Sequence, residues 1–225
     1  MQDQQIVLSA EGVTVAAKGA DSRPLCAPLS FQLRQGQKAL LSGPSGCGKT
    51  TLLNALVALH PVHSGRIRLF EDTEVVKLKA KARQNLLRSR IAYVGQDLNP
   101  FPGLTVQEFL EFNQRISNNQ VDREFARSML DGVGVGQCWG KELEQLSKGQ
   151  LQRVLVCGGI VRRSELVILD EPTSALDTHS RDALIELLDE YVADGMTCIV
   201  VSHDPALTER FDSQVRMDKA GEPSV

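Results

Sequence analysis

Short apolar runs recur along the chain and are separated by Gly, Pro and polar residues. In the first part of the chain, apolar and polar positions alternate in the manner of antiparallel strands with one buried face. A turn-prone segment, Asp21 to Pro24, separates the first two of these runs. The pattern predicts strands at residues 6–15, 29–33, 38–42, 66–70 and 91–94.

Helical spacing becomes prominent further along. Residues 51–59 predict a helix that stops near Pro61, because proline cannot continue a helix. Residues 98–163 are mostly helical in pattern, with Phe and Leu at helical spacing over 106–112. The Gly-rich stretch 132–136 interrupts this pattern, so more than one helix is expected there.

Two continuous apolar runs, 166–169 and 197–201, are typical of parallel strands that are buried on both faces. An amphipathic helix is expected between them, at 181–192. Strands that alternate with helices around a mostly parallel sheet define an α/β fold. We therefore predict an α/β fold with an antiparallel β-rich front part and a helical insertion, without an internal repeat.

Composition narrows the choice of partner and compartment. The 225 residues carry a formal net charge of −3 at pH 7, which does not favour nucleic acid as a partner. The short basic cluster 77–81 is best explained as a solvated helix face. No stretch approaches the ~20 apolar residues that a membrane span requires. Residues 1–5 lack the features of a secretion signal. The five cysteines are scattered along the chain, which indicates reduced thiols. A cytoplasmic protein is expected.

The strongest chemical signal is a Gly-rich loop between a predicted strand and a predicted helix. Gly43 and Gly48 frame four residues, and Lys49 and Thr50 follow, which is the P-loop pattern. Glycines let backbone N–H groups face phosphate oxygens, and the helix dipole adds positive potential. Lys49 is expected to pair with the β- and γ-phosphates, and the Thr50 hydroxyl to ligate Mg²⁺.

A second signal is the buried strand 166–169, which ends in two acids. The carboxyl edge of a parallel sheet is where α/β proteins place their ligands. Asp170 is therefore expected to hold Mg²⁺, directly or through water. Glu171 is expected to polarise the water that attacks the γ-phosphate. The two signals together predict a site for ATP and Mg²⁺.

Four further motifs give a resemblance to the ATP-binding subunits of ABC transporters over essentially the full chain. Leu146-Ser147-Lys148-Gly149-Gln150 resembles the LSGGQ signature, the most specific of them. Tyr93 to Gln96 resembles the Q-loop, and Ser174 to Asp177 resembles the D-loop. Val201 to Asp204 resembles the switch segment, with a histidine after an apolar strand.

The resemblance implies a role for each motif. Gln96 would sense Mg²⁺ and water and link to a membrane partner, and His203 would contact the γ-phosphate. Ser147, Gly149 and Gln150 would bind ATP held by an opposing subunit. The cradle for the phosphates would comprise Gly43, Pro44, Ser45, Gly46, Cys47, Gly48, Lys49, Thr50 and Thr51. The catalytic residues would be Glu171, His203 and Gln96, and the metal ligands Thr50, Gln96 and Asp170.

The resemblance also implies an architecture and an assembly. One ABC ATPase domain would fill residues 1–225, with a P-loop core and antiparallel β subdomain at 1–97 and 164–225 and a helical subdomain at 98–163. The working unit would be a dimer, either a homodimer or a heterodimer with another ABC ATPase subunit. It would energise a transmembrane permease from the inner face of the cell membrane, and no nucleic acid partner is expected.

The chain departs from the family pattern at several positions. Lys148 replaces the first glycine of the signature, and no aromatic residue for stacking on adenine occurs over 15–19. The run 156–161 differs from the small and basic residues that are common at this place in the family. We interpret these residues as part of the packing of a helix, without a chemical role. Cys47 could act as a redox brake on nucleotide binding, although a tolerated small residue is the favoured interpretation.

Two alternatives compete with the transporter subunit. A soluble ABC-type ATPase of DNA repair or translation would need a long coiled-coil insertion or a second ATPase unit, and neither is present. A regulatory module that binds nucleotide without hydrolysis is disfavoured by the presence of Glu171 and His203. Within the transporter interpretation, the segment 96–106 resembles small bacterial ATPases that serve separate permeases. Some of these ATPases serve exporters and others serve importers, and the permease selects the cargo. The transported substrate and the direction of transport therefore stay open.

Overall fold

A four-stranded antiparallel sheet forms the front of the molecule. The computed structural model describes residues 5–17, 23–97 and 99–221. The sheet has the order β2-β1-β4-β5, and β1 pairs antiparallel with both β2 and β4. Of the expected turn at 21–24, residues 21 and 22 lie outside the described residues. The strands are β1 (Ile6–Thr14), β2 (Leu29–Arg34), β4 (Ser64–Leu69) and β5 (Thr73–Glu74).

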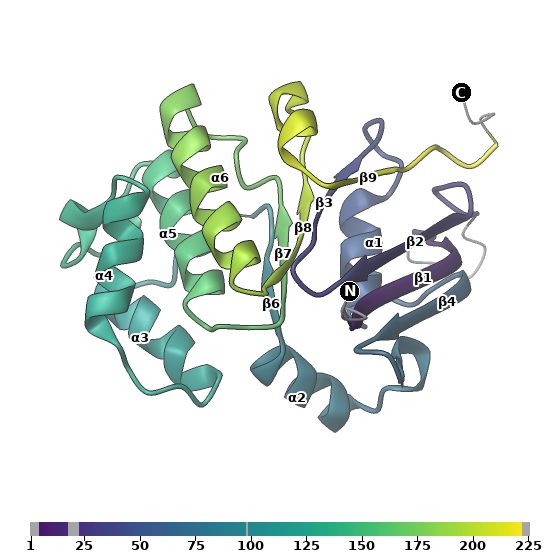
Figure 1. Ribbon diagram of the computed structural model, residues 1–225, viewed down its shortest axis with the longest axis horizontal. Helices are drawn as coiled ribbons and strands as arrows, with labels where there is room; N and C mark the ends of the chain where they lie inside the picture. Colours follow the sequence, from purple (N-terminus) through teal and green to yellow (C-terminus); the bar gives the residue numbers. More distant parts are fainter. Residues whose placement is uncertain (1–4, 18–22, 98, 222–225) are drawn as a thin grey trace.

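A five-stranded parallel sheet lies at the centre, as predicted. Its order is β6-β7-β8-β3-β9, and all neighbouring strands run parallel. The carboxyl ends of these strands point upward in Figure 1, where β8 leads into the short helix η4 (Pro205–Arg210). The strands are β3 (Lys38–Ser42), β6 (Ile91–Val94), β7 (Leu166–Asp170), β8 (Thr197–Val201) and β9 (Ser213–Arg216).

The helices occupy both sides of the parallel sheet. In Figure 1, α1 lies between the two sheets, and α3, α4, α5 and α6 gather on the opposite side. Among the described residues, no helix combines the length and apolar character that crossing a membrane requires. The helices are α1 (Lys49–Leu56), α2 (Ala80–Ser89), α3 (Val106–Ile116), α4 (Arg123–Gly132), α5 (Lys148–Ile160) and α6 (Thr178–Ala193).

Most predicted elements are present, with small shifts at their ends. The strands at 38–42, 91–94 and 197–201 have the predicted bounds, and α4 ends where the Gly-rich stretch begins. The first helix begins two residues earlier than predicted and ends at Leu56, five residues before Pro61. The short strands β5 and β9 are absent from the prediction because neither segment shows a clear apolar pattern.

Alternate residues of the central strands pack into two different hydrophobic clusters. Ile168 of β7 and Ile199 of β8 pack with α1 and the antiparallel sheet. Val167 and Leu169 of β7 face the other way and pack with α3 to α6. This follows from the two-residue side-chain period of a strand. The parallel sheet is thus packed against a hydrophobic cluster on each of its two faces, up to its carboxyl edge.

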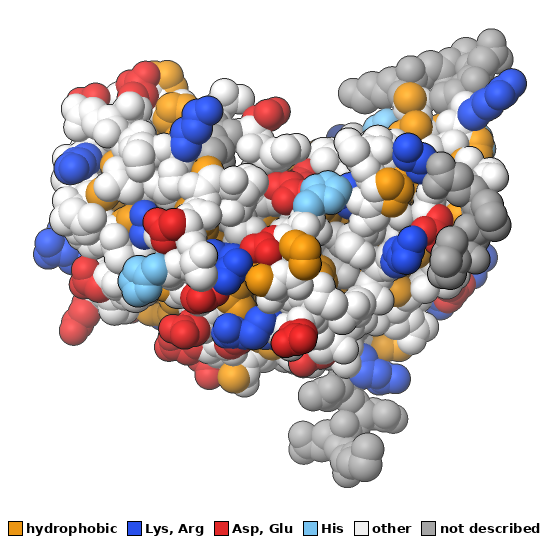
Figure 2. Space-filling view, turned by 90° about the horizontal axis from the view of Figure 1, so that it is seen from above, with side chains coloured by type: hydrophobic (Ala, Val, Ile, Leu, Met, Phe, Trp, Pro, Cys, Tyr) orange, Lys and Arg blue, Asp and Glu red, His pale blue; other side chains and the backbone are white. Residues whose placement is uncertain are grey.

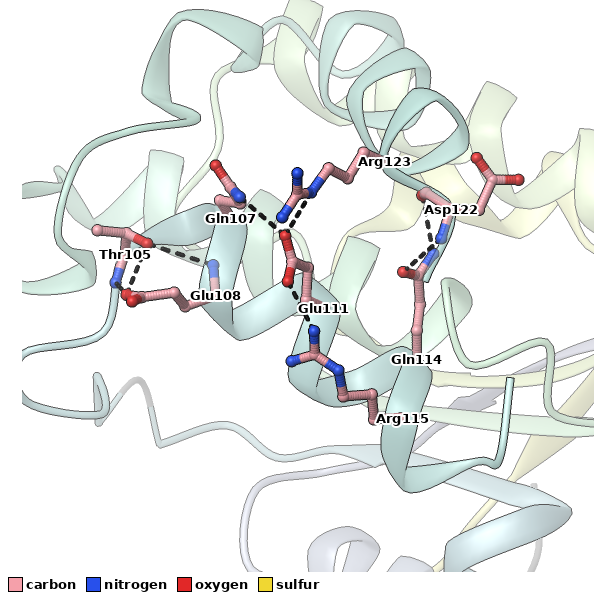
Figure 3. Close-up of polar contacts among 8 residues, drawn as sticks. All are labelled: Thr105, Gln107, Glu108, Glu111, Gln114, Arg115, Asp122 and Arg123. Atoms are coloured by element: carbon pink, nitrogen blue, oxygen red, sulfur yellow. Dashed lines mark hydrogen bonds and ion pairs between the residues drawn. The ribbon is translucent and has the colours of Figure 1, made fainter. Parts of the chain in front are cut away.

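A buried glutamate joins α3 to α4 in the helical part (Figure 3). One oxygen of the Glu111 carboxylate accepts hydrogen bonds from Arg123 Nε at 2.7 Å and from Gln107 Nε2 at 2.8 Å. The other oxygen accepts from Arg115 Nη2 at 3.0 Å. The hydrogen bond from Arg123 is the main reason why the pKa of Glu111 lies below its usual range. The charged form of Glu111 is therefore favoured by folding.

Replacement of Glu111 by glutamine should lower stability in a pH-dependent way. Because the pKa of Glu111 is lower in the folded than in the unfolded protein, its contribution is complete above the unfolded value and is lost as pH falls through the folded value. We expect Glu111→Gln to unfold at lower denaturant than the parent at pH 7. This difference should shrink as pH falls below the ordinary glutamate pKa of about 4.3. Urea titrations at several pH values measure it, and a difference that does not vary with pH would contradict the assignment.

Candidate nucleotide site

The Gly-rich loop connects β3 to α1 at the carboxyl edge of the parallel sheet. Gly48 is the residue before α1 and has a φ of 92°, in the left-handed region that favours glycine. Gly43 has a φ of 152°, and a Cβ atom there would lie 2.4 Å from the Met217 carbonyl oxygen. The backbone path of the loop therefore depends on glycine at both positions.

Lys49 is buried at the first position of α1, with 8% of its surface exposed. Its amine donates hydrogen bonds to the carbonyl oxygens of Gly43 at 2.9 Å and Pro44 at 3.2 Å. Both partners are neutral, so the positive charge of the amine remains available to an anion in the loop.

Thr50 and Asp170 bring two oxygen ligands together. The Thr50 hydroxyl donates to Asp170 Oδ2 at 2.7 Å, so α1 and the end of β7 meet here. Asp170 is 2% exposed, and burial raises its pKa although the Thr50 hydrogen bond and Lys49 act in the opposite direction. A buried carboxylate beside a hydroxyl fits the preference of Mg²⁺ for oxygen ligands.

Glu171 and His203 face each other at the ends of adjacent strands. Glu171 Oε1 lies 3.5 Å from His203 Nε2, and their side chains are 12% and 54% exposed. Burial is also the main cause that raises the pKa of Glu171. Glu171 has a φ of 53°, which is uncommon for a residue with a side chain, and its N–H donates to the Val201 carbonyl at 2.9 Å. The backbone of Glu171 is thus held in an unusual conformation.

A pocket of about 750 Å³ opens over these residues on the face shown in Figure 2, where acidic and basic side chains are interspersed. This volume is within the range of small-molecule sites. Gly43, Pro44 and Cys47 do not line it, and the Cys47 side chain is fully buried in the hydrophobic cluster around α1. The predicted residues that do line the pocket are Ser45, Gly46, Gly48, Lys49, Thr50, Thr51, Gln96, Asp170, Glu171 and His203.

The signature residues lie away from this pocket, at the start of α5. The Ser147 hydroxyl accepts from the Gln150 N–H at 3.3 Å, and the Gln150 side chain accepts from the Ser147 N–H at 3.1 Å. This capping box explains the Ser–Gln spacing as the start of a helix. Neither these residues nor Gly149 line the pocket, so the chain does not bring its signature to its own phosphate loop.

The pocket also contains residues that the sequence patterns did not single out. Leu25 lines the pocket. It lies close to Gly48, as does Val15, the first residue of the segment 15–19 that lacks an adenine-stacking aromatic. Of that segment, residues 18 and 19 lie outside the described residues. Thr173 and Ser202 line the pocket too, and the Ser202 hydroxyl accepts from the Asp204 N–H at 3.1 Å. No motif marks Leu25 or Thr173, whereas Ser202 lies in the switch segment Val201 to Asp204, for which only the histidine had a predicted role.

Sequence comparison identifies relatives of one kind. The family model described as ABC transporter matches residues 26–174. The macrolide export ATP-binding/permease protein MacB of Marinobacter nauticus is 32% identical over 86% of the chain, which spans 30% of MacB. The glutamine transport ATP-binding protein GlnQ of Escherichia coli is 30% identical over 88% of the chain and 85% of GlnQ. The phosphonates import ATP-binding protein PhnC of Fusobacterium nucleatum is 31% identical over 86% of the chain and 82% of PhnC.

Solved structures support the fold. The bacterial ABC transporter cassette MJ0796, solved as a dimer, has a TM-score of 0.84 with 24% identity, covering 94% of each chain. The same cassette in a post-hydrolysis state with ADP and Pi has a TM-score of 0.85 with 23% identity, covering 96% of this chain and 98% of that one. The α/β fold with its two sheets is therefore the fold of these cassettes.

Proposed function

The chain belongs to the ABC transporter family of ATP-binding proteins, and from this premise we propose that it binds and hydrolyses ATP to energise a separate transmembrane permease. One observation carries the proposal. Lys49, the Thr50–Asp170 pair and the Glu171–His203 pair, which come from distant parts of the sequence, line a single pocket at the carboxyl edge of the parallel sheet. A phosphate-binding amine, a pair of metal ligands and a general base are the parts that ATP hydrolysis needs.

The predicted site residues have distinct roles in the proposed reaction. The N–H groups of the Gly-rich loop and the Lys49 amine bind the β- and γ-phosphates. Thr50, Asp170 and Gln96 would hold Mg²⁺, which when bound neutralises charge on the phosphate oxygens. Glu171 accepts a proton from water as the water oxygen bonds to the γ-phosphorus. The bond to the β–γ bridging oxygen breaks, and ADP and inorganic phosphate leave, while His203 contacts the γ-phosphate.

The assembly follows from the position of the signature. Because Ser147, Gly149 and Gln150 lie outside the pocket of their own chain, they are available to the ATP of an opposing subunit. We propose a dimer, with itself or with another ABC ATPase subunit, that lies on the inner face of the cell membrane. Residues 98–163 would move as a helical subdomain against the rest of the single domain, residues 1–97 and 164–225. Gln96, at the boundary, would link this motion to the permease.

ATPase activity and the permease partner can be measured in one preparation. The purified chain should release phosphate from ATP in the presence of Mg²⁺ and lose this activity in EDTA. A tagged chain recovered from membranes in mild detergent should carry a transmembrane permease, which mass spectrometry identifies. The same tagged chain recovered from a membrane-free extract is the matched control. ATP hydrolysis without any permease in the membrane fraction would support an ATPase but refute the transport role.

A further inference from the structure

A buried amide joins the signature helix to the backbone of Glu171. Gln152, in the second turn of α5, is 3% exposed. Its Nε2 donates to the Glu171 carbonyl oxygen at 2.6 Å, and its Oε1 accepts from the Ala175 N–H at 3.1 Å. The two ends of one side chain thus hold both ends of the turn that follows β7.

The contact matters because Glu171 sits at a strained position. Its φ of 53° lies in the left-handed region, which is unfavourable for a residue with a side chain. Such a conformation persists only where neighbours fix it. On one side, the Val201 carbonyl accepts the Glu171 N–H at 2.9 Å, and on the other, Gln152 and the Ser174 hydroxyl donate to the Glu171 carbonyl.

The start of α5 also packs closely on the same turn. A Cβ atom at Gly149 would lie 2.9 Å from the Ala175 carbonyl oxygen, so the helix and the turn are in backbone contact there. A displacement of α5 along this contact would therefore move Gln152 relative to the Glu171 carbonyl. Gln152 does not line the nucleotide pocket itself.

We propose that Gln152 is a positioning residue that makes the orientation of the Glu171 carboxylate depend on the position of the signature helix. The inference rests on the proposed function, in which the signature contacts ATP on an opposing subunit. Contact between that ATP and the start of α5 would then align Glu171 within the same chain through Gln152. Each subunit would sense, through one hydrogen-bonded side chain, whether its partner holds nucleotide.

Replacement of Gln152 by methionine tests the inference, because methionine keeps the length of the side chain and removes every hydrogen bond of the amide, including the one that Nε2 donates to the Ser174 hydroxyl at 3.4 Å. We expect kcat for ATP hydrolysis to fall about tenfold to hundredfold, because a small misplacement of a catalytic group has effects of this size. KM for ATP should change less than about threefold, because nucleotide binding does not involve Gln152. Gln152→Asn, which draws the amide back by one methylene, should show the same loss if the methionine variant fails to fold.

Gln114 provides a matched control. It is a glutamine of α3, 2% exposed, and its side chain also clamps backbone, donating to the Asp122 carbonyl and accepting from the Asp122 N–H, both at 3.0 Å (Figure 3). Gln114→Met should leave kcat within about twofold of the parent. An equal loss of kcat in both variants would overturn the inference, because it would indicate a general effect on folding.

A double variant shows whether Gln152 acts through Glu171. If it does, Gln152→Met should add almost no further loss to Glu171→Gln, whereas independent effects multiply. Multiplying effects, or a parental kcat in Gln152→Met beside an inactive Glu171→Gln, would overturn this inference and leave the proposed function intact. No ATPase activity in the parent would instead refute the proposed function, whereas full turnover in Glu171→Gln would refute Glu171 as the general base and this inference with it.

Discussion

Replacement of Glu171 by glutamine is expected to reduce ATP turnover by about 10²–10⁴, the usual contribution of a general base. Glutamine has nearly the same shape and keeps the backbone contacts to Val201 and Gln152, but it cannot accept a proton from water. ATP should still bind, since the Gly-rich loop and Lys49 are unchanged. We expect ATP binding to close the proposed dimer and hydrolysis to open it, so the variant should accumulate as an ATP-bound dimer, which size-exclusion chromatography with ATP and Mg²⁺ measures.

The pH dependence of turnover gives a second measurement on the same residue. Burial raises the pKa of Glu171 above its usual value, so the protonated and inactive form should appear at higher pH than for an exposed glutamate. The kcat of the parent should decrease as pH falls through this raised pKa. The residual activity of Glu171→Gln should lack the decrease that comes from protonation of Glu171. Unchanged turnover in the variant would show that another group activates the water.

Replacement of Lys49 by alanine is expected to abolish ATP binding at millimolar nucleotide. The amine is the buried cation at the mouth of the Gly-rich loop, and its present partners are two neutral carbonyl oxygens. Charge-assisted hydrogen bonds to phosphate are stronger than those between neutral groups, so their loss lowers the affinity for ATP. Titration with a fluorescent ATP analogue, or calorimetry, would measure the loss.

Lys141→Ala serves as the matched control for this experiment. Lys141 is an exposed lysine that does not line the nucleotide pocket, so its removal changes the net charge equally without touching the loop. ATP affinity in the control should equal that of the parent. If Lys49→Ala binds ATP as the parent does, the Gly-rich loop is not the phosphate site. Thermal unfolding of both variants would show that a loss of binding does not come from a loss of folding.

The central elements could be predicted because their patterns are local. The strands at 38–42, 91–94 and 197–201 are short apolar runs, and the sequence also places Lys49, Asp170 and Glu171 at strand or helix ends. Parallel strands end at a common edge, so the grouping of these side chains follows from topology. In the structure these three side chains line one pocket.

What the sequence could not predict depends on contacts between distant segments. Gln152 lies in a run, 151–154, that continues the signature as in the family, but the sequence does not give its contacts. Only the packing of α5 on the turn after β7 shows that its buried amide binds the backbone of that turn. Leu25 enters the pocket from a loop with no motif, and β9 is defined by its pairing with β3 rather than by its own pattern. The Cys47 side chain is fully buried, which favours its interpretation as a tolerated small residue.

The division of β7 between two hydrophobic clusters limits how this protein can evolve. Each residue from Leu166 to Leu169 is fully buried in one cluster or the other, and close packing penalises both larger and smaller side chains. The strand that carries Asp170 and Glu171 therefore has little freedom to accumulate substitutions. Substitutions on exposed surfaces, by contrast, cost little stability. Adaptation to a new permease could thus proceed by surface change alone, with the chemistry inherited unaltered.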